Sequence, residues 1–163
     1  MLKIKIVAVG SVKSSELSSL CGEYSRRLRP FARVEVVEVA HEPFRDIGEK
    51  EKAQLAEAER ILRVARNVER QRVGDTRYAL RDVGSMILLE EKGREFNSVE
   101  FAKYLSKLGE SGQEICFVIG GALGLHPSIS LSPLTFPHEM ARLILLEQIY
   151  RAATIMAGKT YHY

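Results

Sequence analysis

Apolar and polar residues follow one another along the chain in blocks that predict alternating strands and helices. Residues 3–9 begin as alternating Lys and Ile and end as a continuous apolar run, which is typical of a strand that enters a buried sheet. Between residues 17 and 28 apolar side chains recur at three- and four-residue steps and predict an amphipathic helix that ends at Pro30. Residues 33–39 alternate again, with β-branched residues. Strand, helix and strand in this order form a βαβ unit, so we expect the two strands to be parallel.

The same alternation continues through the middle of the chain. Residues 48–72 are rich in strong helix formers and carry an apolar stripe that includes Leu55. An apolar strand is predicted at residues 86–91, a helix that begins with Asn97 in a capping box follows, and residues 114–119 form a fourth strand. The pattern therefore predicts an α/β fold, with a mostly parallel sheet and helices on both faces.

The composition is compatible with this fold and limits the cellular locations and metal sites that we expect. The 163 residues are 45% apolar and 28% charged, which favours a single domain over residues 1–163 with its own core. We expect a cytoplasmic protein without a membrane partner, because no apolar run has the length of a membrane span and the first residues do not resemble a signal peptide. The spacing of Cys21 and Cys116 predicts free thiols, and the four histidines lack metal-ligand spacing, so no metal is expected.

Arginine is distributed unevenly along the chain. The net charge of +3 alone does not indicate a nucleic-acid partner, but seven arginines fall between residues 60 and 81. A second cluster consists of Arg26, Arg27, Arg29 and Arg33. Clustered arginines are typical of RNA and DNA binders, because the guanidinium fork suits phosphate groups. Solvated helix faces would show the same clusters, so both interpretations stay open for each of them.

Two loops in the last third of the chain carry candidate chemistry. The glycine-rich segment 120–124 directly follows the strand at 114–119, and ligands of α/β sheets bind at the carboxyl ends of strands. This segment fits neither the P-loop nor the GxGxxG pattern. Segment 130–137 contains two prolines, which prevent pairing inside a sheet and leave backbone groups that a bound adenine could use. The structural alternative for the second loop is an edge strand that leads into a helix at Pro137.

The chain ends in a broad apolar helix and a polar tail. The helix, predicted from Pro137 to Ala157, is apolar around so much of its circumference that we expect the sheet and a second subunit to cover it. Arg142 and Arg151 interrupt the apolar surface, either as salt-bridge partners or as contacts to phosphate or carboxylate groups. The tail Tyr161-His162-Tyr163 is either a frayed end or a catalytic element, since histidine transfers protons near neutral pH.

Several of these segments together resemble one known family. They are the opening strand, the turn Phe117–Leu125, the segment Leu131–His138, the run Glu147–Ala152 and the terminal Tyr161-His162. In this combination they are closely similar to the ribosomal RNA large-subunit methyltransferase H family, which belongs to the SPOUT class of methyltransferases.

The resemblance implies a fold, a reaction and an assembly. It implies a C-terminal trefoil knot and a homodimer formed through the C-terminal helices. It also implies that a methyl group is transferred from S-adenosylmethionine to N3 of a pseudouridine in 23S ribosomal RNA, the RNA of the large subunit. The cofactor positions of the family correspond to Leu89, Gly120, Leu131, Ser132, Pro133, Leu134, Thr135 and Phe136.

The resemblance also suggests roles at the end of the chain. His162 is the candidate that accepts the N3 proton, and Tyr161 would orient it or stack on the base. Arg142 and Arg151 are expected to contact RNA phosphates or the carboxylate of the cofactor, and Lys159 is expected to contact RNA. Two departures are visible: Tyr163 stands where the family usually ends in Arg or Lys, and segment 125–130 is short. Two alternatives stay open, namely a non-enzymatic RNA-binding or ribosome-assembly factor and a SPOUT methyltransferase that acts on transfer RNA.

Overall fold

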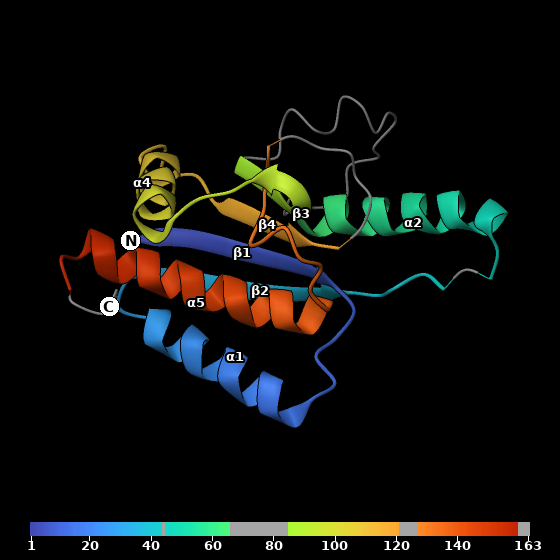
Figure 1. The fold of residues 1–163 in the computed structure, drawn as a ribbon, viewed down its shortest axis with the longest axis horizontal. Helices are drawn as coiled ribbons and strands as arrows, with labels where there is room; N and C mark the ends of the chain where they lie inside the picture. Colours follow the sequence, from blue (N-terminus) through green and yellow to red (C-terminus); the bar gives the residue numbers. More distant parts are fainter. Residues whose placement is uncertain (44, 66–84, 121–126, 160–163) are drawn as a thin grey trace.

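Strands and helices alternate along the chain as the sequence predicts (Figure 1). The protein was analysed as a computed structural model, which describes residues 1–43, 45–65, 85–120 and 127–159. In these ranges the sheet has the strand order β2-β1-β4-β3-β5, and every neighbouring pair is parallel. The elements are β1 (Leu2–Val9), α1 (Ser15–Leu28), β2 (Ala32–Val39), α2 (Ile47–Ala65), β3 (Ser85–Arg94), α4 (Ser98–Gly109), β4 (Ile115–Ile119), β5 (Ser128–Ile129) and α5 (His138–Met156).

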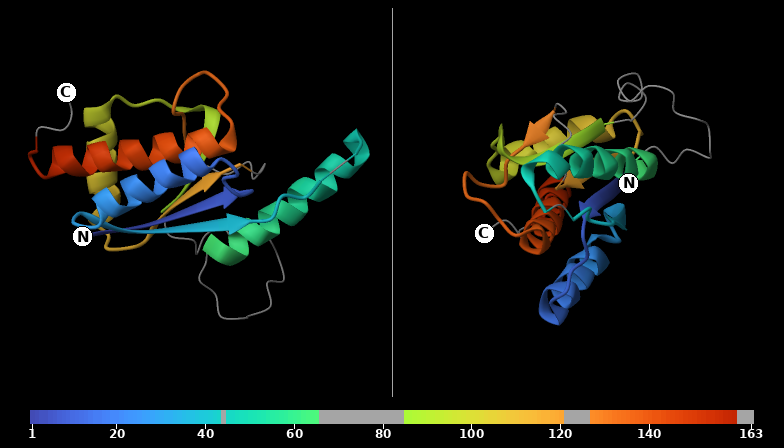
Figure 2. Two further views of the ribbon diagram at one scale, coloured as in Figure 1. Left: turned by 90° about the horizontal axis from the view of Figure 1, so that it is seen from below. Right: turned by 90° about the vertical axis from the view of Figure 1, so that its right-hand side faces the viewer.

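Helices cover both faces of the sheet, which confirms the predicted α/β arrangement. Successive residues of a strand point to opposite faces. Ile6 of β1 therefore lies in the core formed with α1, α4 and α5. Its neighbour Val7 lies in the other core, where Ile61 and Leu62 of α2 cover the sheet. Figure 2 shows α1 and α5 on the opposite side of the sheet from α2.

Local signals in the sequence set the helix boundaries. The Ser14 hydroxyl accepts a hydrogen bond from the Leu17 N–H at 3.2 Å and caps α1. The capping box predicted at α4 is confirmed, because Asn97 and Glu100 each accept a hydrogen bond from the other's N–H, at 2.9 and 3.0 Å. Gly158 follows α5 with a φ of +66°, a conformation that favours glycine and stops the helix.

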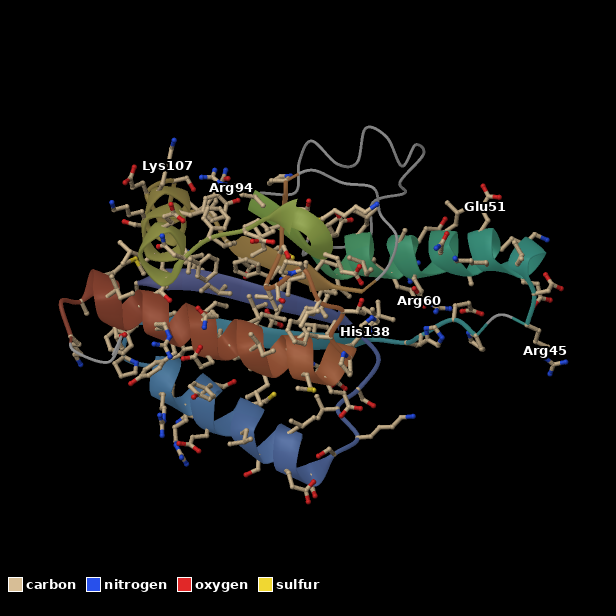
Figure 3. The ribbon with its side chains drawn as sticks, viewed as in Figure 1. Arg45, Glu51, Arg60, Arg94, Lys107 and His138 are labelled. Carbon is tan, nitrogen blue, oxygen red and sulfur yellow. The ribbon has the colours of Figure 1, made fainter. Side chains whose placement is uncertain are left out.

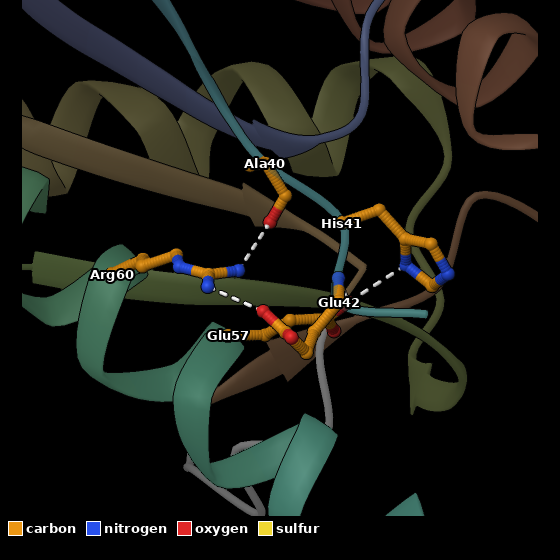
Figure 4. Close-up of polar contacts among 5 residues, drawn as sticks. All are labelled: Ala40, His41, Glu42, Glu57 and Arg60. Carbon is orange, nitrogen blue, oxygen red and sulfur yellow. Dashed lines mark hydrogen bonds and ion pairs between the residues drawn. The ribbon is translucent and has the colours of Figure 1, made fainter. Parts of the chain in front are cut away.

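Polar contacts fasten α2 to the end of β2 (Figure 4). The buried Glu57 carboxylate accepts a hydrogen bond from the Glu42 N–H at 3.0 Å and lies 2.7 Å from His41 Nδ1. Arg60 donates to the Ala40 carbonyl oxygen at 3.0 Å and pairs with the Glu42 carboxylate. Arg60, the first member of the long arginine cluster, therefore has a structural role, whereas positions 66–81 of that cluster lie outside the described residues.

Two details of the strand and helix predictions were wrong. The first half of α2 projects beyond the sheet (Figure 2), so Leu55 is 60% exposed and does not belong to the buried stripe. Strand β3 does not end before Gly93 but continues to Arg94, with a shift in register between Leu89 and Arg94. This extension pairs with Ile129 of β5 and turns the end of β3 into part of a pocket wall.

The remaining expectations concern cysteines, membranes, metals and the knot. Cys21 and Cys116 are free thiols as predicted, and burial raises the pKa of Cys116 to about 12.

Within the described ranges no helix has both the length and the apolarity of a membrane span. The same part of the chain contains no group of three or more His, Cys, Asp or Glu side chains placed to hold a metal ion. The C-terminal knot stays a prediction, and residues 121–126 in this part of the chain lie outside the described residues.

Candidate active site

A cavity of about 480 Å³ lies where β3 and β4 end and α5 begins. Three segments that are far apart in the sequence form its walls: the end of β3, the end of β4, and the loop that leads into α5. Most of the predicted cofactor residues line this cavity, namely Leu89, Gly120, Leu131, Ser132, Leu134, Thr135 and Phe136, whereas Pro133 does not. The geometry therefore brings together residues that the sequence alone left scattered.

Gly120 directly follows β4 and forms part of the pocket wall. Its φ of +83° lies in the left-handed region that favours glycine. A Cβ atom at this position would lie 2.8 Å from Cε1 of His138 and 3.2 Å from Cβ of Val9. Glycine is therefore required for both the turn and the packing, as the prediction of a glycine turn at the strand end implies. The four residues of segment 120–124 that follow Gly120 are outside the described residues.

Hydrogen bonds hold the pocket loop in an irregular shape. The Ser130 hydroxyl donates to the Ser132 carbonyl oxygen at 2.9 Å, and the Leu134 N–H donates to the Ser132 hydroxyl at 3.1 Å. Thr135 donates to the carboxylate of Glu91, which connects the loop to the end of β3. The alternative of an edge strand for segment 130–137 is wrong, because the two-residue strand β5 ends before this segment; the helix expected at Pro137 does follow it as α5. The loop itself stays outside the sheet and can use its backbone groups for a ligand.

The composition of the walls suits a ligand with an apolar ring and a positive charge. Leu131 and Phe136 supply apolar surface, and Leu134 is 71% exposed beside the cavity. Glu90 and Glu91 add carboxylates at the same site. Carboxylates stabilise a nearby cation, and apolar walls favour a flat ring.

Sequence reasoning missed six of the residues that line the pocket, the apolar Ile119 and Ala141 and four residues with charged or polar side chains. Glu90, Glu91 and Lys92 line the cavity from the end of β3, and His138 also lines it. Figure 3 labels His138 at the start of α5. All three β3 residues come just after the buried part of a strand, at its carboxyl end. The rule that ligands bind at the carboxyl ends of parallel strands could have identified them. His138 could have been identified from its position directly after the proline-containing loop.

Arg142 was expected to contact RNA or the cofactor, but the structure places it inside the protein. Its side chain is buried, with a residue exposure of 4%. One guanidinium nitrogen lies 2.5 Å from a carboxylate oxygen of Glu38, and another donates to the Gly10 carbonyl oxygen at 2.9 Å. Among the described residues, its Nε atom has no hydrogen-bond partner. Arg142 thus fastens α5 to β2 and to the end of β1.

Replacing Arg142 by Met is expected to destabilise the fold. The substitution leaves the Gly10 carbonyl and the Glu38 carboxylate without their partner and should lower the free energy of unfolding by about 3 kcal/mol. Urea unfolding followed by circular dichroism measures this change. The matched control is Arg151→Met on the same helix, which removes a partly exposed pair and should cost less than about 1 kcal/mol. Equal stability of Arg142→Met and the unmodified protein would contradict the structural role.

The other predicted RNA contacts lie at the far end of α5. Arg151 bonds to the Glu147 carboxylate at 3.0 and 2.6 Å, which is the intrahelical pair considered as an alternative. The Lys159 ammonium lies 4.8 Å from the centre of the Phe31 ring, at the turn between α1 and β2. The predicted catalytic residues Tyr161 and His162 follow directly and lie outside the described residues.

The pocket and the tail are at opposite ends of α5. This helix has 19 residues, which corresponds to about 28 Å at 1.5 Å per residue. The four residues after Lys159 span at most about 14 Å when fully extended. Four residues are therefore too few to extend from Lys159 back to the start of α5, where the pocket lies.

The parallel sheet and the cavity at its carboxyl edge define an α/β protein with a candidate site at the ends of β3 and β4, and the sequence comparisons give its class. The family model described as "Predicted SPOUT methyltransferase" matches residues 2–162, and the chain belongs to this family. Within it, the chain belongs to the ribosomal RNA large subunit methyltransferase H family, as the resemblance predicted.

The relatives match over essentially their whole length. The chain is 39% identical to the protein named "Ribosomal RNA large subunit methyltransferase H" of Symbiobacterium thermophilum and 37% identical to that of Desulfitobacterium hafniense. It is also 37% identical to the putative enzyme of the same name from Methanococcus maripaludis. Each of these comparisons covers 99% of this chain and 99% of the relative.

Proposed function

We propose that this protein is an S-adenosylmethionine-dependent methyltransferase that methylates N3 of a pseudouridine in 23S ribosomal RNA. The observation that carries the proposal is the cavity at the carboxyl ends of β3 and β4, because it unites Leu89, Gly120 and the loop 131–136. The names of the relatives, which specify large-subunit ribosomal RNA, support the substrate. A non-enzymatic RNA-binding factor would not require a pocket with this set of residues.

The pocket residues fit the proposed cofactor. Backbone groups of the loop 131–136 would bond to the adenine ring, and Leu89 and Phe136 would pack against it. The carboxylates of Glu90 and Glu91 would stabilise the positively charged part of the molecule. When bound, S-adenosylmethionine supplies a methyl group on a sulfonium that a nitrogen nucleophile can attack.

The tail would supply the proton acceptor. N3 of the base carries a proton and becomes nucleophilic only when that proton leaves. In the proposed reaction the imidazole of His162, which Tyr161 would orient, would accept the N3 proton. The N3 lone pair would then take the methyl group while the bond between the methyl carbon and the sulfonium sulfur breaks, so that neutral S-adenosylhomocysteine leaves. Fixing N3 in line with the methyl group supplies a further part of the rate through proximity. No metal ion takes part in this scheme.

The length of α5 supports a homodimer with shared active sites. Because the tail is too short to reach its own pocket, we propose that it enters the pocket of a second subunit. Large apolar side chains on α1 and α5 support an interface there, since Leu20 is 42% exposed, Met140 43% and Met156 39%. We also propose a cytoplasmic location, because the proposed substrate is ribosomal RNA.

Cofactor binding tests the enzymatic part of the proposal. Isothermal titration calorimetry should detect S-adenosylmethionine binding, and Leu134→Asp should weaken it at least about tenfold because a charge enters the apolar rim. Val99→Asp is the matched control: Val99 is 48% exposed at the start of α4, away from the cavity, and its replacement should leave the affinity unchanged. If the unmodified protein does not bind the cofactor, the enzymatic proposal is wrong.

Mass mapping of RNA tests the substrate. Ribosomal RNA from a strain that lacks this gene should miss one methyl group on a pseudouridine of the large subunit. Reintroducing the gene should restore the methyl group. An unchanged ribosomal RNA map together with a methyl group lost from transfer RNA would establish the other SPOUT alternative.

A further inference from the structure

A second cavity, of about 660 Å³, lies between the end of α1 and the start of β2. Three exposed arginines line it, Arg26 and Arg29 from the end of α1 and Arg33 from β2. Arg26 and Arg29 are three residues apart at the helix end, and therefore neighbours on its surface. Arg33 stands close to the first residue of the chain, Met1, which lines the same cavity. We call this site the arginine groove and define it by Arg26, Arg29 and Arg33.

The positive charge of the arginine groove is not neutralised by the protein. In the part of the chain that the structure describes, no carboxylate forms an ion pair with Arg26, Arg29 or Arg33. The neighbouring Arg27 differs, because it pairs with Glu23 within α1. Three unpaired guanidinium groups from two elements around one concave surface attract a polyanion, and the guanidinium fork suits phosphate oxygens in particular.

The groove lies beside the origin of the tail. Phe31 belongs to the turn between Arg29 and Arg33, and the Lys159 ammonium lies 4.8 Å from the centre of its ring. Phe31 also packs edge-on against Tyr150 of α5, so the turn and the end of α5 are in firm contact. Figure 1 shows the end of α1 and the end of α5 at the same end of the molecule. Lys159, the last described residue before the tail, therefore lies next to the turn between Arg29 and Arg33.

We infer that the arginine groove binds the phosphate backbone of the substrate RNA beside the nucleotide that the tail acts on. This inference rests on the proposed function, because it takes the tail to be the element that handles the target base. Groove and tail belong to one subunit, whereas the cofactor pocket belongs to the other. Each active site would thus combine the groove and tail of one subunit, which hold the RNA, with the cofactor pocket of the other subunit.

The salt dependence of RNA binding tests the inference. The probe is a fluorescently labelled fragment of 23S ribosomal RNA that contains pseudouridines, titrated by anisotropy from about 50 to 200 mM salt. The double variant Arg29→Gln/Arg33→Gln should lower the slope of log affinity against log salt by about 1.4, since each lost phosphate contact contributes about 0.7 for single-stranded RNA. The affinity at physiological salt should fall about tenfold or more. Methylation by this variant should need more RNA for half-saturation, with an unchanged rate at saturating RNA.

A matched control has the same change of charge elsewhere. Lys103→Gln/Lys107→Gln removes two exposed charges from α4, outside the arginine groove, and should leave the slope nearly unchanged. The conservative variant Arg29→Lys/Arg33→Lys should restore most of the slope, and all variants should bind S-adenosylmethionine like the unmodified protein. A normal slope in Arg29→Gln/Arg33→Gln, or an equal loss in the control, would overturn the inference.

The same experiment separates the inference from the proposed function. If the unmodified protein transfers no methyl group, the proposed function is refuted. If the groove variant nevertheless loses RNA affinity selectively, that result supports the groove as an RNA site. Normal methylation and normal RNA affinity in the groove variant would refute the groove alone.

Discussion

A chain truncated after Thr160 should bind S-adenosylmethionine normally and lose methyl transfer by about 10²- to 10⁴-fold. The truncation removes His162, and a positioned proton acceptor contributes this much to a reaction of this kind. Cofactor affinity should persist because the pocket is formed by the ends of β3 and β4 and by the loop before α5. Calorimetry with the cofactor and transfer of a labelled methyl group to ribosomal RNA measure the two properties. Full activity of the truncated chain would contradict the role of the tail.

Mixed dimers show which pocket the tail serves. The truncated chain retains an intact pocket, and Leu134→Asp retains an intact tail with a weakened pocket. Each should be nearly inactive alone at a cofactor concentration that does not saturate Leu134→Asp. A dimer of one truncated and one Leu134→Asp chain should recover about half of the normal activity, because one of its two sites combines an intact pocket with an intact tail. No recovery in the mixed dimer would mean that the tail does not act across subunits.

Gly93→Ala should lower the free energy of unfolding by about 3 kcal/mol and weaken cofactor binding. A Cβ atom at Gly93 would lie 2.4 to 2.7 Å from backbone atoms of Ile129. Backbone atoms cannot rotate away as a side chain can, so β5 would have to separate from β3. The hydrogen bond from the Ser130 N–H to the Arg94 carbonyl oxygen, 2.9 Å long, would be lost with this movement. Because the loop 131–136 follows directly, the pocket wall would move as well.

A second glycine of the same chain serves as the control for Gly93→Ala. Gly22 lies inside α1, and a Cβ atom there would meet nothing within 4 Å. Gly22→Ala should therefore stabilise the protein by up to about 1 kcal/mol, because alanine favours helix. Urea unfolding and calorimetry with S-adenosylmethionine apply to both variants. Normal stability and cofactor affinity in Gly93→Ala would show that the close contact of β3 and β5 is not required.

Local patterns predicted most of the fold because they reflect the geometry of single elements. The alternation in residues 33–39 follows from the two-residue repeat of a strand, and the capping box of Asn97 depends on residues three positions apart. Parallel pairing of β1 and β2 followed from the βαβ order, which allows few other arrangements. Such features need no knowledge of distant parts of the chain.

Features that depend on distant contacts were predicted less well. Leu55 has the spacing of a buried residue, yet the sheet is too short to cover that part of α2. Arg142 has the sequence context of a surface arginine, and only the packing of α5 against β2 buries it beside Glu38. The sequence around Gly93 is typical of an ordinary strand end. The close approach of Gly93 to Ile129 depends on residues far along the chain.

For this protein the sequence by itself determined the α/β order of elements, the membership of the methyltransferase family and most of the pocket residues. The tertiary structure decided how these residues meet, since three segments converge only when β3 and β4 lie side by side. It also decided that Lys159 lies at the far end of α5 from the pocket, across a length of helix that four residues cannot span. Motifs record which residues a family uses, whereas distances between them arise only when the chain is folded.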